Sequence, residues 1–285
     1  MKFRTTIEMP DYPFRIDYGN RLIFIGSCFS DHIGGFFKEN GFNACSNPYG
    51  VLFNPSSIAL ALRLAMNPDQ FGELYEYRHQ DLWVSFAHHG KFSHPDQEVF
   101  RDNIKRQLHE TGEFLKKADY LFITFGTAYY YKFKTRDLIV ANCHKIPGYE
   151  FQKERLTVER IIEEYRSLCQ YLFQFNPSLK IIFTVSPVRH LGDGFHENQL
   201  SKSILHLAID SLVDNRSCFY FPSYEILMDD LRDYRFYARD FCHPDDEAVQ
   251  YMIEKLTDTF FEEDTILRWK EIEKENRRKR HISLR

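Results

Sequence analysis

The sequence lacks the features that define several broad classes of protein. It has no apolar run near the roughly 18 residues that a membrane-spanning helix needs. Its first ten residues contain no apolar stretch that could act as a secretory signal. The 6 cysteines are scattered without a C-x-x-C pair, which argues against a disulfide framework or a zinc ribbon. We therefore expect a cytoplasmic chain without a membrane span, whose thiols are reduced and chemically available.

A basic excess is also missing. The chain has 37 Lys and Arg against 41 Asp and Glu, which gives a formal net charge of −4. A protein that binds nucleic acid through phosphate contacts usually carries the opposite sign, so we expect no nucleic-acid partner. The sequence predicts no cofactor either. Glycine is sparse, at 13 residues, whereas aromatic residues make up 16% of the chain and are expected mostly to fill the core.

Short apolar runs alternate with longer amphipathic runs over most of the chain. This pattern is typical of βαβ units around a mostly parallel sheet. The predicted strands are 22–25, 120–125, 180–185 and 218–221. The predicted helices are 31–40, 54–66, 102–117, 157–175, 201–214 and 245–261. We predict a single α/β domain over 1–262.

Three segments depart from this alternation. Residues 68–100 and 129–153 have weak periodicity, and long insertions of this kind often form lids or pocket walls. For residues 263–285 the sequence predicts a charge-dense helical tail with the basic run 277–280 near its end. Such a run is usually solvated, with binding of an anionic partner as the alternative.

The first candidate for chemistry is the turn Gly26-Ser27-Cys28, between a predicted strand and a helix. Ligands of open parallel sheets bind beyond the carboxyl ends of the strands. The N–H groups at a helix start attract negative charge and would favour a thiolate. Either side chain could therefore be a nucleophile. The alternative is that Cys28 is a small buried apolar residue and Ser27 a helix cap.

The second candidate is the pair Asp240 and His243, just before the last predicted helix of the domain. A carboxylate three positions before an imidazole can bond one ring nitrogen and leave the other free as a general base. The alternative is a loop ion pair or a helix cap. A nucleophile near the first strand and an oriented histidine near the end of the domain would together make a hydrolytic site.

The histidines at 88, 89 and 94 suggest a further possibility. They have no H-E-x-x-H spacing, but a loop could place them with Asp81 or Asp96 around a metal ion. Hydrogen bonding to a substrate and simple surface exposure are the other interpretations.

Taken together, these residues resemble a known family. Gly26-Ser27-Cys28-Phe29-Ser30 is similar to the G-S-C-F-A signature of the GSCFA domain family, which is grouped with the SGNH (GDSL-like) hydrolases. Further similar segments are 47–55, 124–128, 141–145, 184–190, 201–202 and 240–244, so that the resemblance spans about residues 20–255. It implies a three-layer α/β/α sandwich with a mostly parallel central sheet, SGNH-hydrolase-like (flavodoxin-like). It also implies ester or acyl-transfer chemistry on an acylated carbohydrate or a similar substrate.

The resemblance also implies roles for individual residues. The first block of the superfamily is G-D-S, and without a gap its nucleophile position holds Cys28. Ser27 matches only after a shift of one residue, so we favour Cys28. The D-x-x-H block makes His243 the base and Asp240 the residue that orients it. Gly50 resembles the glycine of the second block, whose N–H helps to hold the oxyanion together with the N–H of the nucleophile.

The third block departs from the pattern of the superfamily. It is normally G-x-N, but Gly126-Thr127-Ala128 has alanine in place of the asparagine that donates to the oxyanion. Loss of one such donor can lower the rate about 10²–10³-fold. Either Thr127, Asn142 or His144 supplies a substitute, or the protein is a poor hydrolase.

Three hypotheses about function follow. The preferred one is an esterase or acyltransferase that acts on O-acylated carbohydrate or a small-molecule ester. The second is a glycan- or acyl-binding module on the same fold, catalytically impaired by the missing asparagine. The third is a metal-dependent hydrolase that uses the histidines between 88 and 94.

Overall fold

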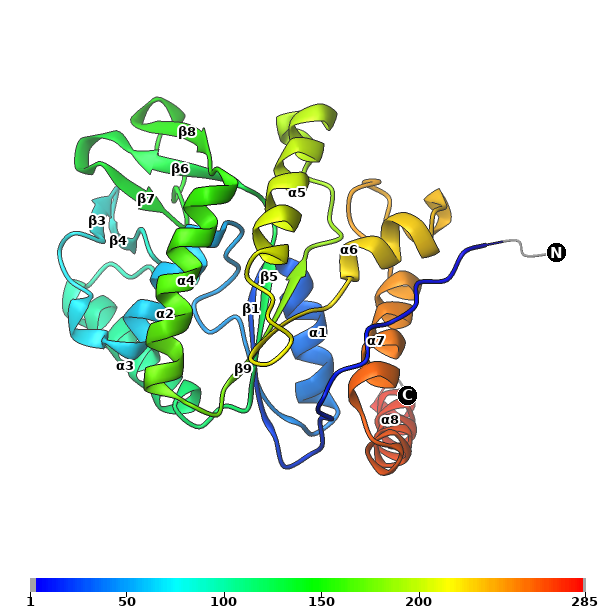
Figure 1. The fold of residues 1–285 in the computed structure, drawn as a ribbon. Helices are drawn as coiled ribbons and strands as arrows, with labels where there is room; N and C mark the ends of the chain where they lie inside the picture. Colours follow the sequence, from blue (N-terminus) through cyan, green and yellow to red (C-terminus); the bar gives the residue numbers. More distant parts are fainter. Residues whose placement is uncertain (1–3, 284–285) are drawn as a thin grey trace.

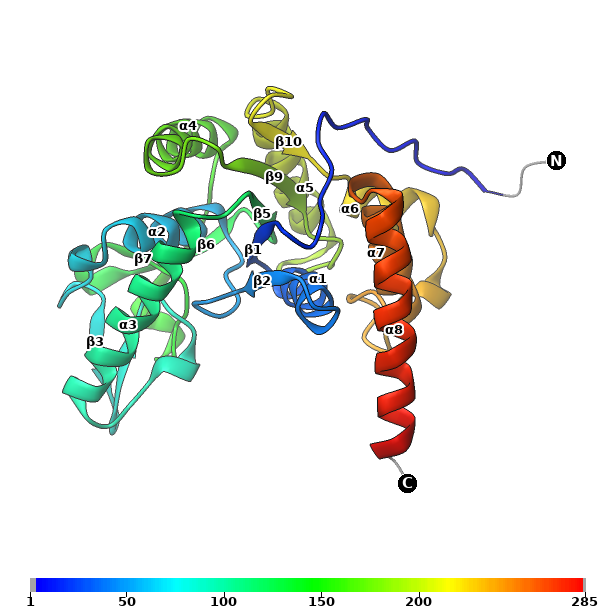
Figure 2. The ribbon, with the colours of Figure 1, turned by 90° about the horizontal axis from the view of Figure 1, so that it is seen from below.

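A parallel sheet lies at the centre of the protein. The structure is a computed structural model that describes residues 4–283, without the side chains of 277 and 279–283. The sheet lies at the centre of Figure 1, and its five strands have the order β10-β9-β5-β1-β2, as labelled in Figure 2. They are β1 (Arg21–Gly26), β2 (Asn43–Ser46), β5 (Tyr120–Phe125), β9 (Lys180–Val185) and β10 (Cys218–Tyr220). All four pairings are parallel, so the carboxyl ends of the strands share one edge.

Helices cover both faces of this sheet. Successive strand residues point to opposite faces, and Ile23 and Leu22 of β1 lie in two different buried clusters. The Ile23 face packs against α2 (Pro55–Met66), α3 (Gln97–Leu115), α4 (Val158–Phe175) and α5 (Phe195–Asp210). The Leu22 face packs against α1 (Cys28–Glu39) and α7 (Asp246–Phe260). Figure 2 shows α7 beside α1, with α2, α3 and α4 across the sheet. The predicted three-layer α/β/α architecture is therefore confirmed.

The predicted elements agree with the structure except at some boundaries. The strands predicted at 120–125 and 180–185 and the helix predicted at 54–66 are confirmed, the helix as Pro55–Met66 with Asn54 as its cap. However, α1 begins at Cys28 and α5 at Phe195, several residues before the predicted starts. The prediction missed β2, because this edge strand has four residues and none of them is fully buried.

The two weakly periodic segments form small antiparallel sheets. Residues 68–100 contain the hairpin of β3 (Glu76–His79) and β4 (Leu82–Ser85). A second sheet covers residues 129–155. It consists of β6 (Tyr129–Phe133), β7 (Leu138–Val140) and β8 (Phe151–Arg155), in the order β7-β6-β8. Both lie together at the upper left of Figure 1, over a small cluster that includes Phe86 and Phe133. Strands of three to five residues are too short for a clear periodic signal.

The C-terminal helix packs against the domain at its beginning. A short α6 (Ser223–Glu225) precedes α7, and α8 (Glu263–Ser283) follows it. Trp269 of α8 is buried, with its ring 5.5 Å from that of Phe36 in α1. The predicted charged helix is thus present, but it is not solvated throughout. In the basic run 277–280 the only described side chain is that of Arg278, which is exposed. Among the described residues, no helix combines the length and apolar character needed to cross a membrane.

Candidate functional site

The two predicted catalytic segments meet at the carboxyl edge of the sheet. A cavity of about 380 Å³ lies there. The β1–α1 turn contributes Ser27 and Cys28, and the loop before α7 contributes Asp240, Cys242 and His243. The rest of the lining comes from Phe53, Gly126, Thr127, Ser186, Val188, Arg189, His190 and Leu191. No residue of 68–100 or 129–153 lines this cavity. The expectation that these segments form a wall of the pocket is therefore wrong for this cavity.

The β1–α1 turn depends on close contact between two strands. Gly26 has a φ of +140°, and a Cβ atom there would collide with the carbonyl oxygen of Thr124 in β5. The N–H of Gly26 donates to Oδ1 of Asn47 at 2.8 Å, and the N–H of Ser27 donates to the Thr124 carbonyl at 3.2 Å. Only glycine suits this backbone and this space. The turn therefore holds Cys28 at the first position of α1.

The two candidate nucleophiles differ in accessibility. Ser27 is 2% exposed, and its hydroxyl oxygen is buried with no hydrogen-bond partner in the described part of the chain. Cys28 is only partly buried. The helix start was expected to favour a thiolate, but burial raises the pKa of the Cys28 thiol, which outweighs the lowering effect of the N–H groups of Phe29 and Cys28. The resting thiol is therefore protonated at neutral pH and needs a base to become a nucleophile.

Asp240 binds His243 through both carboxylate oxygens. Its Oδ2 lies 2.6 Å from Nδ1 of the His243 ring. Its Oδ1 accepts hydrogen bonds from the N–H groups of Cys242, at 2.9 Å, and His243, at 3.0 Å. The N–H groups of His243 and Cys242, together with the ring of His243, lower the pKa of the Asp240 carboxyl to about 2. An ionised Asp240 favours a proton on Nδ1 and leaves Nε2 as the basic nitrogen.

Contact between the base and the nucleophile is not made in this conformation. Within residues 4–283, neither Cys28 nor Ser27 forms a hydrogen bond with the ring of His243. In free enzymes such bonds are often long, and they shorten when substrate binds. The cavity thus brings Cys28, His243 and Asp240 together, but only His243 and Asp240 are joined by a hydrogen bond.

A fully buried lysine lies beneath the cavity. Lys202 of α5 has no exposed surface, and its Nζ donates to the carbonyl oxygens of Gly126, at 2.8 Å, and Ser186, at 2.7 Å. It therefore ties together the loops that follow β5 and β9. Burial and, to a smaller extent, the nearby charge of Arg189 together lower the pKa of Lys202 to about 7, with Cys28 acting in the opposite direction.

Lys202 has no role in the hypotheses drawn from the sequence. Its neighbour Ser201 also holds the loop after β5, because the Ser201 hydroxyl accepts from the N–H of Ala128 at 2.8 Å. Helical spacing could have revealed both residues, since Leu205 and Ala208 are buried on the same face of α5. A lysine on an apolar helix face is unusual and often has a specific partner.

The predicted oxyanion donors are mostly engaged elsewhere. The structure does not bring Gly50 to the cavity, and its N–H donates to the carbonyl of Asn47 at 2.8 Å. Gly126 and Thr127 do line the cavity, but their N–H groups donate to the carbonyl of Phe53 at 2.8 and 3.0 Å. Of the backbone donors considered, the N–H of the nucleophile remains, because the first residue of a helix has no intrahelical acceptor.

Asn142 and His144 do not line the cavity either. Oδ1 of Asn142 accepts from the N–H of His144 at 2.8 Å, and Nε2 of His144 lies 2.7 Å from the carbonyl of Ser85. The pair therefore fastens the loop after β7 to the end of β4. As substitutes for the missing asparagine these two residues are misplaced, because the small sheets lie to one side of the strand ends.

The histidines at 88, 89 and 94 do not form a common ligand set. His88 is 1% exposed, its Nδ1 lies 2.8 Å from the hydroxyl of Ser85, and burial lowers the pKa of its ring to about 3. His89 caps a short turn by accepting from the N–H of Lys91. Among residues 4–283, no three His, Cys, Asp or Glu side chains gather as metal ligands would. The geometry does not favour the metal-site hypothesis.

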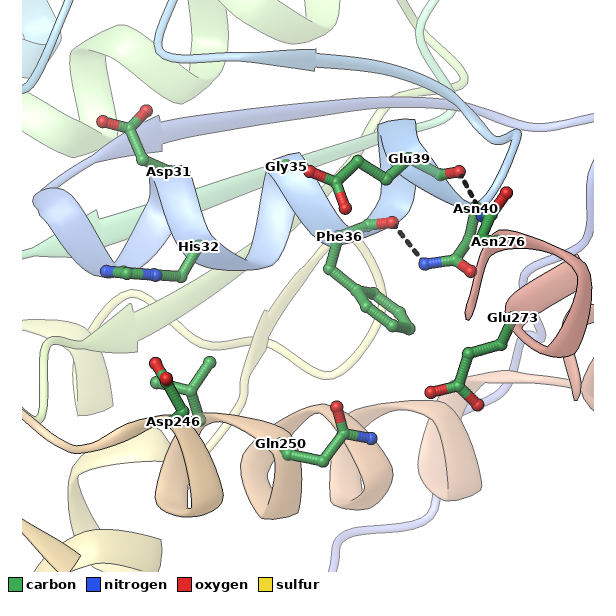
Figure 3. Close-up of a pocket in the computed structure, with 11 residues that line it drawn as sticks. Asp31, His32, Gly35, Phe36, Glu39, Asn40, Asp246, Gln250, Glu273 and Asn276 are labelled. Atoms are coloured by element: carbon green, nitrogen blue, oxygen red, sulfur yellow. Dashed lines mark hydrogen bonds between the residues drawn. The ribbon is translucent and has the colours of Figure 1, made fainter. Parts of the chain in front are cut away.

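A different cavity, of about 420 Å³, lies between α1, α7 and α8. Figure 3 shows His32 on α1 and Asp246 on α7 facing each other across it, with Glu273 of α8 at one end. Asp31 and Glu39 add to its acidic lining. None of the predicted catalytic residues reaches this cavity, so it is separate from the candidate site.

The fold and the site together define a three-layer α/β protein with a thiol, an imidazole and a carboxylate at the carboxyl edge of its parallel sheet. Residues 21–256 match the model of the GSCFA family, and the chain belongs to that family. A solved structure from Streptococcus pneumonia, provisionally described as a platelet activating factor, is similar at 13% identity, with 85% of this chain and 84% of that chain covered and a TM-score of 0.43. No curated protein matches the sequence.

Proposed function

We propose that this protein is an SGNH-like esterase or acyltransferase that acts on O-acylated carbohydrate or a related small ester. One observation carries the proposal. Cys28 and the Asp240–His243 pair line the same cavity although they are far apart in the sequence. Their place at the carboxyl ends of parallel strands is where α/β proteins bind ligands.

In the proposed acylation step, Cys28 attacks the ester carbonyl carbon while Nε2 of His243 takes the thiol proton. Because the resting thiol is protonated, proton removal and attack belong to the same step. Asp240 holds the ring through Nδ1 and stabilises the imidazolium that forms. The alcohol then leaves with the proton from His243, and the acyl group remains on sulfur as a thioester.

In the proposed deacylation step, His243 takes a proton from water or from a second hydroxyl as that oxygen attacks the thioester carbonyl carbon. The C–S bond then breaks, and His243 returns the proton to the leaving sulfur, which restores the Cys28 thiol. Attack by water gives a hydrolase, and attack by a hydroxyl gives a transferase. The N–H of Cys28 at the start of α1 can donate to the oxyanion in both steps, supported by the positive end of the helix.

A catalytically impaired binding module is the second candidate. Two observations favour it, namely the raised pKa of Cys28 and the engaged N–H groups of Gly126 and Thr127. Such a module would use the same cavity to bind a glycan or an acyl group without turnover.

Hydrolysis of a panel of acyl esters by purified protein tests the proposal. The variants are Cys28→Ala, Ser27→Ala and His243→Ala, with thermal unfolding as the control for folding. We expect Cys28→Ala and His243→Ala each to lower kcat/KM by about 100-fold or more, and Ser27→Ala to have a smaller effect. Undiminished activity in both Cys28→Ala and His243→Ala would exclude the mechanism. Ligand binding without turnover in the unmodified protein would establish the binding module.

A further inference from the structure

A second cavity adjoins the candidate site. It has a volume of about 540 Å³ and shares Arg189 and Leu191 with the first. Its other lining residues are Phe195, Met228, Arg232, Asp233, Tyr234, Tyr237 and Phe241. The two spaces are therefore neighbours, and a molecule that lies in one can extend into the other past Arg189.

The loop that carries the candidate base divides the two cavities. Asp240, Cys242 and His243 line the first cavity, whereas Phe241 between them lines the second. Phe241 has a φ of +56°, in the left-handed region that a bulky side chain rarely adopts. Strain of this kind persists where the surroundings impose it and is concentrated at functional sites. Here it places the ring of Phe241 on the opposite side of the loop from His243.

The second cavity presents aromatic rings to solvent. Phe195 is 71% exposed, Tyr234 77% and Phe241 59%. The rings of Tyr234 and Phe241 meet edge to face with their centroids 6.0 Å apart. Aromatic side chains usually bury their surface, so a group of exposed rings around a cavity marks a binding surface for the apolar face of a ligand.

Arg189 adds an available positive charge at the junction. Its Nε donates to Oδ1 of Asn198 at 3.1 Å, and its Nη1 lies 3.7 Å from the sulfur of Met228. Within the described part of the chain it forms no salt bridge, whereas Arg232 in the same cavity pairs with Asp229 at 3.2 Å. A half-buried guanidinium without a carboxylate partner suits a carboxylate or phosphate, which it can bind with two parallel hydrogen bonds.

The proposed chemistry indicates which half of an ester would enter this cavity. The general base returns its proton to the alcohol as the alcohol leaves, so the alcohol half must lie beside His243. The second cavity shares Arg189 and Leu191 with the cavity that His243 lines, so an alcohol half that lies beside His243 can extend into it.

We infer that the second cavity binds the alcohol half of the substrate, and that this half is a sugar ring with an anionic group. The ring packs against Tyr234 and Phe241, and the anionic group binds to Arg189. This inference rests on the proposed function for the orientation of the ester, but binding to the cavity can be measured without turnover. A uronic acid and a sugar phosphate would supply the same chemistry, and the experiment separates them.

The experiment is titration calorimetry on the His243→Ala protein, which avoids turnover. The ligands are methyl glucuronide, glucose-6-phosphate and the neutral methyl glucoside. We expect at least one anionic sugar to bind about tenfold or more tightly than the glucoside, and the tighter of the two identifies the anion. In the same background, Arg189→Gln should remove the preference for the anionic sugar. Tyr234→Ala should weaken the binding of the anionic sugars, whereas Tyr234→Phe should retain it. Arg235→Gln is the matched control for Arg189→Gln. Arg235 is next to Tyr234 in the sequence but does not line the cavity.

Equal affinity for charged and neutral sugars would overturn the inference. So would a preference for the anion that survives Arg189→Gln. Assays of acetylated forms of the same sugars with the unmodified protein separate the two proposals. Turnover without preference for an anionic sugar contradicts the inference alone. Anion-dependent binding without any turnover contradicts the esterase proposal, and of the inference it removes only the assignment of the sugar as an alcohol half.

Discussion

Asp240 holds both the ring and the backbone of His243 with a single carboxylate. Oδ2 lies 2.6 Å from Nδ1 of the ring, while Oδ1 accepts from the N–H of the same residue at 3.0 Å. The imidazole is therefore fixed relative to its own backbone. This arrangement gives a direct test of the role of the carboxylate.

Replacing Asp240 by Asn should lower kcat for ester hydrolysis by about 100-fold or more. The asparagine Oδ1 can still accept from the backbone, but its NH₂ would face Nδ1 and force the proton onto Nε2, which is the wrong tautomer for a base. The measurement is kcat and KM for a soluble acyl ester. Asp245→Asn is the matched control, because Asp245 caps α7 and asparagine is an equally good cap. An Asp240→Asn enzyme as fast as the Asp245→Asn control would contradict the assigned role.

Alkylation of Cys28 by iodoacetamide should be slow at pH 7 and should still be increasing at pH 9. Only the thiolate reacts, and burial raises the pKa of Cys28 above its ordinary value of 9.0. Mass spectrometry of digested protein distinguishes Cys28 from the other five thiols, and Cys28→Ser identifies its peptide. A midpoint of reactivity below pH 7 would show instead that the thiolate is formed in the resting protein.

Replacing Lys202 by Met should reduce the slope with which the free energy of unfolding rises with pH above neutral pH. Burial lowers the pKa of Lys202 to about 7, from 10.5 for an exposed lysine. Between these values the unfolded chain binds more protons than the folded one, so the free energy of unfolding rises with pH, by at most about 1.4 kcal/mol per pH unit from this residue. Urea unfolding at pH 7, 8 and 9 measures the effect. The exposed Lys105→Met on α3 should follow the unmodified protein, and an equal slope in Lys202→Met would refute the prediction.

Replacing Gly26 by Ala should destabilise the protein by roughly 2–4 kcal/mol, because it adds backbone strain at positive φ to a collision with the Thr124 carbonyl. Gly35→Ala is the opposite case. A Cβ atom at Gly35 meets nothing within 4 Å, and alanine within α1 should stabilise by about 0.5–1 kcal/mol. Denaturant unfolding of both variants gives the comparison. Similar effects of the two substitutions would mean that the β1–β5 contact does not constrain the turn.

The prediction of the fold from sequence was largely correct because its signals are local. The apolar run 120–125 and the periodic segment 54–66 carry their own structure, and Asn54 with Pro55 marks the start of a helix within a few residues. The small sheets and β2 were not found, because their strands have only three to five residues, too few for a clear periodic signal. In addition, β2 and β8 pair with β1 and β6, which are more distant in the sequence.

The candidate site was predictable to a similar extent. The D-x-x-H spacing predicted the bond between Asp240 and His243, since three positions are enough for a carboxylate to reach the ring. The roles suggested for Gly50, Asn142 and His144 required their groups to reach a shared cavity. The structure instead engages these groups with Asn47 and Ser85, or with each other.

The sequence alone determined four of the five central strands, the helices that cover them and the carboxylate beside His243, because these depend on residues within a few positions of each other. Only the tertiary structure decided that the two segments share a cavity, that Lys202 is buried beneath it and that the Cys28 thiol keeps its proton. Desolvation and hydrogen-bond competition depend on whatever parts of the chain surround a group, and most of those parts are remote in the sequence.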